Sequence, residues 1–282
     1  MKFTKMQGAG NDYIYVDCIH ENLPEEDRPD FSIKVSDRHF GVGSDGLICI
    51  CSSEVADFRM DMYNADGSRG KMCGNGIRCV AKYVYDFGLT NKEKFTVETA
   101  SGIKNITLTV EDGKAVLIRV DMEAPILKPG DVPVKFPGQT DKPLINAEYE
   151  VAGKKVKATI VSMGNPHSVI FTDDPVEDMD LDRIGPDYEF HPYFPERVNT
   201  EFVNVISRSE VKMRVYERGS GETLACGTGC CAIGVAGVLN GLTDKKVTIH
   251  TRGGDILVEY DPDGDGIVYM TGPAAVVCTG DF

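Results

Sequence analysis

The sequence places a cysteine in the same short motif twice, and this repetition is its first indication of chemistry. Cys73 opens "CGNG" and Cys226 opens "CGTG", and each motif starts a segment of helical length. The first backbone N–H groups of a helix are unpaired and carry partial positive charge, which stabilises a thiolate and also binds a carboxylate. The two motifs therefore predict two reactive thiols, each at the start of a helix.

Two thiols that flank one cavity have the chemistry to invert a tetrahedral carbon. One removes a proton as a thiolate base, while the other delivers a proton as a thiol acid to the opposite face. The Cα–H of an amino acid is a very weak acid, so the developing carbanion needs donors aimed at its α-carboxylate. The amides that follow each cysteine, at Asn75-Gly76 and Gly227-Thr228, could supply these donors.

Other interpretations of the glycine and cysteine motifs fit less well. "GVGSDG" at 41–46 matches G-x-G-x-x-G, but the "LICIC" that follows is typical of a strand, whereas a dinucleotide fingerprint opens a helix. "GTGCCA" at 227–232 matches a looser form, yet its counterpart at 74–79 ends in cysteine. No paired C-x-x-C set offers ligands to zinc, so no metal is expected. A Cys–His nucleophile would leave one of the two motifs without a role.

Composition and charge narrow the class of protein. The 282 residues, 41% of them hydrophobic, are enough for two domains. A net charge of −14 repels phosphate backbones and anionic lipid, so neither nucleic acid nor a membrane is an expected partner. The first 18 residues lack the pattern of a signal peptide, and nine cysteines, an odd number, indicate reduced thiols in the cytoplasm. Seven of them are interpreted as small core residues: Cys18, Cys49, Cys51, Cys79, Cys230, Cys231 and Cys278.

An internal repeat organises the chain. Cys73 and Cys226 are 153 residues apart, and the same offset lays "FRMDMYNADGS" at 58–68 over "VKMRVYERGS" at 211–220. Asn64 and Glu217 correspond in these segments, each nine residues before its cysteine. The paired methionines and tyrosines of the two segments are interpreted as core: Met60 with Met213 and Tyr63 with Tyr216.

The repeat predicts two similar halves, residues 1–122 and 144–282, joined by a Pro-rich crossing linker at 123–143. Each half contains short alternating strands and one prominent helix, which favours an α+β fold in which a curled, mainly antiparallel sheet wraps a central helix. Gly88 and Gly241 fall where a left-handed helix cap prefers glycine. The last residues could pack back on the first half. The active site is expected between the halves.

Seven segments carry a resemblance to a known family: "KMQGAGNDYIYVD" (5–17), "YNADGS" (63–68), "MCGNGIRC" (72–79), "VSMGNPH" (161–167), "PERVNTEF" (195–202), "YERGSGETLACGTGCCA" (216–232) and "YMTGPA" (269–274). In these segments, and over nearly its whole length, the sequence resembles the diaminopimelate epimerases. The resemblance implies a cofactor-independent isomerase that interconverts LL- and meso-diaminopimelate in lysine and peptidoglycan precursor biosynthesis. It also implies a homodimer.

The resemblance further implies roles for individual residues. Cys73 and Cys226 are the two acid/base thiols, and His167 and Glu217 assist them. The reacting carboxylate is held at the helix starts by Asn75, Gly76, Gly227 and Thr228. The amino groups and the distal carboxylate of the substrate are bound by Asn11, Asn64, Asn165, Asn199, Glu217 and Arg218. Some members have a glutamine where this chain has Gly46, and Ser44 or a water would replace its hydrogen bonds.

Two alternatives stay open at this stage. A proline racemase or hydroxyproline epimerase also uses paired cysteines, but usually has histidine where Asn75 stands. A non-catalytic amino-acid-binding or dithiol redox protein would use Cys73 and Cys226 as a pair that can form a disulfide. His167 on its own would be interpreted as a structural histidine. Glu217 and Arg218 could be an ordinary surface pair, but their position in the loop before Cys226 favours a role in the site.

Overall fold

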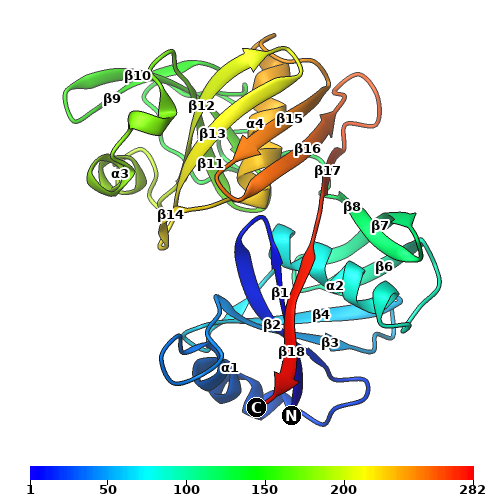
Figure 1. Ribbon diagram of the computed structural model, residues 1–282. Coiled ribbons are helices and arrows are strands. Elements are labelled where there is room, and N and C mark those ends of the chain that lie inside the picture. The colour runs from blue at the N-terminus through cyan, green and yellow to red at the C-terminus, as the bar shows by residue number, and fades with distance from the viewer. The chain divides into compact units, whose positions relative to one another are not determined.

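The computed structural model describes residues 1–282 and divides the chain into two compact units. The first unit comprises Met1–Asp121 together with Thr271–Phe282, and the second is the continuous segment Met122–Met270 (Figure 1). None of the helices is both long enough and apolar enough to span a bilayer.

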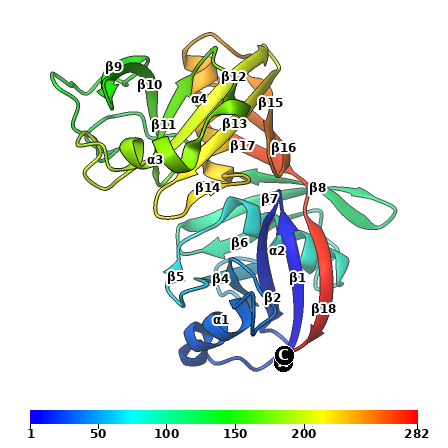
Figure 2. The ribbon, with the colours of Figure 1, turned by 60° about the vertical axis from the view of Figure 1, so that its left-hand side comes forward.

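The first unit is a sheet with two helices. Its helices are α1 (Arg28–Ser36), preceded by a 3-10 turn at Glu25–Asp27, and α2 (Gly74–Asp86). Its strands are β1 (Lys2–Gly8), β2 (Asn11–Asp17), β3 (Gly46–Cys51), β4 (Phe58–Asn64), β5 (Arg69–Gly70), β6 (Lys94–Thr99), β7 (Gly102–Glu111), β8 (Lys114–Asp121) and β18 (Ala275–Asp281). β18 pairs antiparallel with β1, so the two chain termini lie side by side (Figure 2).

The second unit repeats this plan. Its helices are α3 (Leu181–Glu189), preceded by a 3-10 turn at Val176–Asp178, and α4 (Gly227–Leu239). Its strands are β9 (Ala147–Val151), β10 (Lys154–Ser162), β11 (Pro166–Phe171), β12 (Asn199–Ser207), β13 (Glu210–Glu217), β14 (Gly221–Thr223), β15 (Lys246–Thr251) and β16 (Gly254–Tyr260). β17 (Val268–Gly272) carries the chain across the boundary into the first unit.

Strand pairing confirms the internal repeat. In the first unit β1–β2, β3–β4, β4–β5 and β6–β7 are antiparallel, while β2–β3 and β4–β6 are parallel. The second unit has the same sequence of pairings, with β10 to β16 in place of β1 to β7. Both units are therefore mainly antiparallel sheets, and the predicted α+β class of two similar halves is confirmed.

One helix in each unit packs against its own sheet. α2 lies against β1, β2 and β8, and α4 lies against strands that include β10 and β16 (Figure 1). Small residues in α4 make a close approach possible, since a Cβ added at Gly234 would lie 2.5 Å from Val258 Cγ1. Both helices end as expected. Gly88 and Gly241 have φ of +80° and +67°, the left-handed conformation of a helix cap.

The Pro-rich segment 123–143 lies inside the second unit, so its description as a crossing linker is wrong. Val132, Val134 and Phe136 alternate with its prolines and are buried in the hydrophobic cluster that also holds Tyr149. The segment has no regular strand, because proline lacks a donor, yet its apolar side chains anchor it to the core.

Three further details differ from expectation. Cys278 is exposed on β18 and is not a core residue, whereas Cys18 is partly buried and packs against the core cluster of the first unit. α1 and α3 are helices that the sequence pattern did not reveal. By contrast, "LICIC" is the buried strand β3, which confirms that "GVGSDG" is not a dinucleotide fingerprint.

We predict that Gly234→Ala lowers the free energy of unfolding by about 1–3 kcal/mol, because the new methyl group overpacks α4 against Val258. The matched control is Gly130→Ala, where an added Cβ meets nothing within 4 Å. Urea denaturation of the two variants measures the difference. Equal midpoints for both would show that α4 is not closely packed on β16.

Candidate active site

Cys73 is the N-cap residue of α2. Its backbone is extended (φ −127°, ψ 119°), and its carbonyl accepts the first helical hydrogen bond, from the amide of Ile77 at 2.9 Å. The amide of Gly76 donates to Cys73 Sγ at 3.3 Å. The sulfur thus takes the place of a capping oxygen at a helix end that carries partial positive charge, which favours a thiolate.

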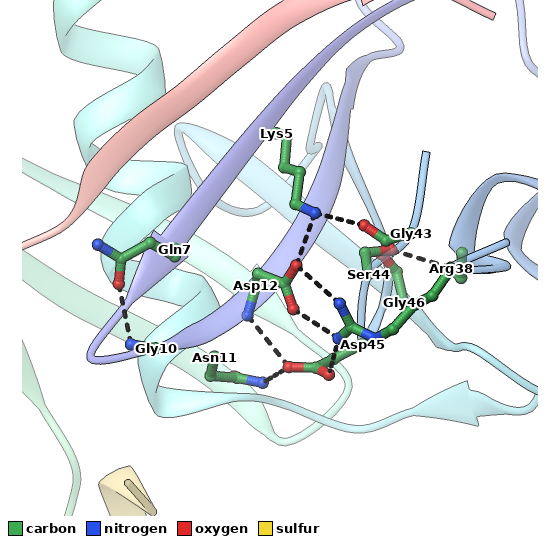
Figure 3. A network of polar contacts seen from close by, with 11 residues as sticks. Lys5, Gln7, Gly10, Asn11, Asp12, Arg38, Gly43, Ser44, Asp45 and Gly46 are labelled. Atoms are coloured by element: carbon green, nitrogen blue, oxygen red, sulfur yellow. Dashed lines mark hydrogen bonds and ion pairs between the residues drawn. The ribbon is translucent and has the colours of Figure 1, made fainter. Parts of the chain in front are cut away.

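An amide side chain also meets this sulfur. Cys73 Sγ donates to Asn11 Oδ1 at 3.1 Å. Asn11 Nδ2 in turn donates to Asp45 Oδ2 at 2.6 Å (Figure 3). Asn64, another predicted substrate-binding residue, ends β4 and donates to Ser68 Oγ at 2.9 Å. Asn75 is buried in the first turn of α2. The first unit therefore gathers five predicted site residues: Asn11, Asn64, Cys73, Asn75 and Gly76.

Ser44, one expected replacement for the glutamine that some family members have at Gly46, bonds within its own unit. Its hydroxyl is buried and donates to the carbonyl of Gly46 at 2.9 Å, with Ser36 Oγ at 3.0 Å. A role of Ser44 toward a ligand stays a prediction. A Cβ at Gly46 would lie 2.1 Å from the carbonyl oxygen of Tyr63, so β3 and β4 leave room only for glycine there.

Cys226 is the N-cap residue of α4 and repeats the geometry of Cys73. Its backbone is extended (φ −114°, ψ 114°), and the amide of Gly229 donates to Cys226 Sγ at 3.4 Å. Thr228 Oγ1 lies 3.4 Å from the same sulfur. Cys226 is only 5% exposed, whereas Cys73 is partly exposed, so the two thiols have different surroundings.

Carboxylates surround Cys226. Burial raises the pKa of its thiol well above the ordinary value, and the negative charges of Glu217 and Glu201 raise it further. Hydrogen bonds from Thr228 and Gly229 act in the opposite direction. Burial likewise raises the pKa of the Glu217 carboxyl, although hydrogen bonds from Thr223 and Cys226 lower it. Cys226 is therefore a thiol at neutral pH, and Glu217 is the carboxyl best placed to receive its proton.

His167 is fully buried beside an acid that sequence analysis missed. His167 Nδ1 lies 2.7 Å from Glu201 Oε1, and both side chains have no exposed surface. His167 Nε2 lies 3.1 Å from Asn165 Oδ1, while Asn165 Nδ2 donates to Thr228 Oγ1 at 3.3 Å. Polar contacts therefore link Glu201 through His167 and Asn165 to Thr228, whose hydroxyl lies next to the Cys226 sulfur.

The sequence does contain a pattern that indicates Glu201. It is an acidic residue inside the run "TEFV" of β12, whose other side chains are buried. A buried acid needs a cationic or donor partner, and β11, the parallel neighbour of β12, carries His167. Gly229 is part of the same arrangement, because a Cβ there would lie 2.6 Å from Glu201 Oε1.

Asn199 and Arg218 hold the loops of the second unit together. Asn199 Nδ2 donates to the carbonyl of Pro166 at 2.8 Å, and the amide of Arg218 donates to Asn199 Oδ1 at 3.0 Å. Arg218 Nη1 donates to the carbonyl of Glu196 at 3.0 Å. The second unit therefore gathers the remaining predicted site residues: Asn165, His167, Asn199, Glu217, Arg218, Cys226, Gly227 and Thr228.

We predict that Glu217→Gln shifts alkylation of Cys226 to lower pH. The substitution removes a negative charge that raises the Cys226 pKa, so the thiolate forms more readily. The rate of modification by iodoacetamide, followed across pH by mass spectrometry of the Cys226 peptide, measures the shift. Glu222→Gln on β14 is the control, since the Glu222 carboxylate pairs with Arg214 and Arg252. A midpoint unchanged in Glu217→Gln would contradict the assignment.

We predict that Glu201→Ala destabilises the protein by about 1–3 kcal/mol, because it leaves His167 Nδ1 buried without its hydrogen-bond partner. Asp244→Ala breaks the exposed pair with Arg208 and should cost less than about 1 kcal/mol. Guanidinium denaturation compares the two. Similar costs would mean that the Glu201–His167 pair does not support the second unit.

Known proteins resemble this chain over its whole length. The family model for diaminopimelate epimerase matches residues 3–128 and 159–277. A diaminopimelate epimerase from Acetivibrio thermocellus is 55% identical over 282 residues, covering 100% of this chain and 98% of that protein. One from Methanococcus maripaludis is 50% identical, with 100% and 99% covered.

Solved structures show the same fold at much lower identity. A phenazine biosynthesis protein of the PhzF family from Bacillus anthracis matches with a TM-score of 0.71 at 18% identity, covering 99% of this chain and 98% of that one. A hydroxyproline epimerase from Agrobacterium vitis matches with a TM-score of 0.67 at 14% identity, covering 99% and 90%. The fold is thus shared among these proteins, while the sequence relationship is narrower: this chain belongs to the diaminopimelate epimerase family.

Proposed function

We propose that the protein interconverts LL- and meso-diaminopimelate without a cofactor, in the biosynthesis of lysine and peptidoglycan precursors. The observation that carries this proposal is a cysteine at the N-cap of the long helix in each of two units with the same strand pairing. Membership of the family supplies the substrate. We place the reaction in the cytoplasm and expect a homodimer.

The reaction is a proton transfer between two bases. When the substrate is bound, Cys226 passes its proton to Glu217 and its thiolate removes the Cα proton. The Cys73 thiol delivers a proton to the opposite face and is left as a thiolate that the Gly76 amide stabilises. In the reverse direction the two cysteines exchange roles. The raised pKa of Glu217 supports this assignment, because a carboxylate with a higher pKa is a stronger base toward a neighbouring thiol.

Helix starts stabilise the charge that develops on the substrate. The first N–H groups of a helix have no carbonyl partner within it, so those of α2 and α4 suit the α-carboxylate as electrons move from Cα toward it. Asn75, Gly76, Gly227 and Thr228 lie in these first turns. Electrostatic stabilisation of this kind is needed because no cofactor is invoked to hold the electrons.

The distal end of the substrate is a second amino-acid group, and the remaining polar residues suit it. The Arg218 guanidinium offers charge-assisted hydrogen bonds to the distal carboxylate. Amide side chains of Asn11, Asn64, Asn165 and Asn199 offer neutral donors and acceptors for the amino groups. Proline and hydroxyproline have no such distal end, so the shared fold with a hydroxyproline epimerase does not favour them as substrates.

We predict that reduced protein incubated with LL-diaminopimelate in D2O, without added cofactor, incorporates deuterium at Cα and forms the meso isomer. NMR and chiral chromatography follow the two signals. Proline and hydroxyproline are incubated in parallel. Exchange of those substrates alone would assign the protein to another activity of this fold, and exchange of none would leave a binding or redox role.

Cys73→Ser and Cys226→Ser should each lower epimerisation by about 100-fold or more, because a hydroxyl is a much weaker acid than a thiol. Cys278→Ser, at an exposed cysteine outside the site, is the matched control and should retain activity. Circular dichroism verifies that all three variants fold. Full turnover in either of the first two would disprove the two-base mechanism.

A further inference from the structure

The side-chain amide of Asn11 lies between a thiol and a carboxylate. Its oxygen accepts the Cys73 thiol proton at 3.1 Å, and its nitrogen donates to Asp45 Oδ2 at 2.6 Å. If the side-chain amide of Asn11 were flipped, its NH2 group would face the Cys73 sulfur and its oxygen would face the Asp45 carboxylate. The orientation of this one amide therefore decides whether Cys73 meets an acceptor or a donor.

Asp45 determines that orientation. An ionised carboxylate only accepts hydrogen bonds, so it pairs with the NH2 group of Asn11 and repels the amide oxygen. The same Asp45 oxygen accepts from the amide of Asp12 at 3.1 Å, which fixes the carboxylate against the start of β2 (Figure 3). Asn11 therefore has to direct its oxygen toward Cys73.

Two cations pair with Asp45 and with the neighbouring Asp12. Arg38 Nη2 lies 2.8 Å from Asp45 Oδ1 and 2.9 Å from Asp12 Oδ1, and Lys5 Nζ lies 2.9 Å from Asp12 Oδ2 (Figure 3). Two cations thus balance two carboxylates. The pKa of Asp12 is lowered by hydrogen bonds from Arg38 and Lys5, which outweigh the opposing effect of burial. The cluster is therefore a fixed, neutral support for the amide.

We propose that Asp45 is a positioning residue that keeps Cys73 protonated by fixing the amide of Asn11. A thiol can donate to the amide oxygen, whereas a thiolate would face that oxygen's negative end, so this geometry favours the acid form. The catalytic consequence rests on the proposed function: Cys73 is held ready as the proton donor while Cys226 acts as base. Asp45 itself does not touch Cys73.

Other ionisable groups around Cys73 do not replace this effect. Tyr15 on β2 and Cys79 on α2 are fully buried, and burial raises the pKa of Tyr15 well above its ordinary value and that of Cys79 to about 12, so both are neutral at neutral pH. Arg78, a buried cation on α2, donates to the carbonyl of Gly74 at 3.2 Å. At neutral pH, therefore, none of these groups changes its charge.

The test is the pH dependence of Cys73 alkylation by iodoacetamide, measured on the Cys73 peptide of the reduced full-length protein by mass spectrometry. In Asp45→Asn the new amide can donate or accept, so Asn11 is free to turn its NH2 group toward the sulfur and stabilise the thiolate. The alkylation midpoint should fall by about one pH unit.

Asp12→Asn is the matched control. It removes one carboxylate from the same cluster, and thus the same charge, but leaves the contact between Asn11 and Asp45 in place. Its midpoint should equal that of the unsubstituted protein. An equal fall in both variants would assign the effect to the charge of the cluster and overturn the proposal.

A double substitution tests whether Asp45 acts through Asn11. Asn11→Ala removes the acceptor and should lower the midpoint by itself, which also tests the proposal should Asp45→Asn fail to fold. Adding Asp45→Asn to Asn11→Ala should then change nothing further. A second, additive fall would show that Asp45 acts on the thiol directly and would overturn the positioning role.

Alkylation needs no turnover, so this test and the test of the proposed function fail independently. A shifted midpoint in a protein that does not epimerise diaminopimelate would reject the function and retain the positioning role. Epimerisation together with unshifted midpoints in Asp45→Asn and Asn11→Ala would reject the positioning role alone.

Discussion

The proposed chemistry depends on the backbone amides of the first helical turn, which have no carbonyl partner within the helix. In each unit a cysteine sulfur accepts one of these N–H groups, from Gly76 in α2 and from Gly229 in α4. A thiolate is costly in a buried place, and the partial positive charge of the helix end offsets part of that cost without adding a formal charge near the substrate. The rest of each unit serves this arrangement: the sheet holds the helix, and glycines around the cysteine leave space for the sulfur and a ligand.

The same backbone plan carries two different electrostatic environments. Cys73 contacts the neutral amide of Asn11, which in turn contacts a cluster of two cations and two carboxylates. Cys226, by contrast, is buried near the carboxyl groups of Glu217 and Glu201. The repeated fold gives the two cysteines matched positions, and different neighbours make them chemically distinct. The proposed two-base transfer needs one thiolate and one thiol at a time, and unlike surroundings give the two sulfurs different acidities.

Sequence reasoning predicted the features that are local or repeated, and failed where distant residues decide. Sequence patterns predicted the repeat, the two helix starts and the caps at Gly88 and Gly241. The strand pairing confirms the repeat, the N-cap positions of the two cysteines confirm the helix starts, and the positive φ angles of the glycines confirm the caps. α3 was missed because Gly185 and Pro186 in its middle are typical of a loop. In segment 123–143 the prolines indicate a linker, whereas the buried side chains of Val132, Val134 and Phe136 anchor the segment in the core of the second unit. Glu201 and Asp45 were missed because their partners, His167 and Asn11, are 34 residues away along the chain.

The return of β18 to β1 has a consequence for synthesis of the chain. Residues 122–270 form the second unit as one uninterrupted segment, so all of its strands are available before translation ends. The first unit is different: β1 is made among the first residues, while its neighbour β18 is made among the last, and the amide of Phe282 bonds the carbonyl of Met1 at 3.0 Å. On the ribosome one edge of β1 therefore stays open until residues 275–281 emerge. The unit that begins to be translated first is therefore the unit that is completed last. Until β18 arrives, the open edge of β1 can pair with a strand of another chain.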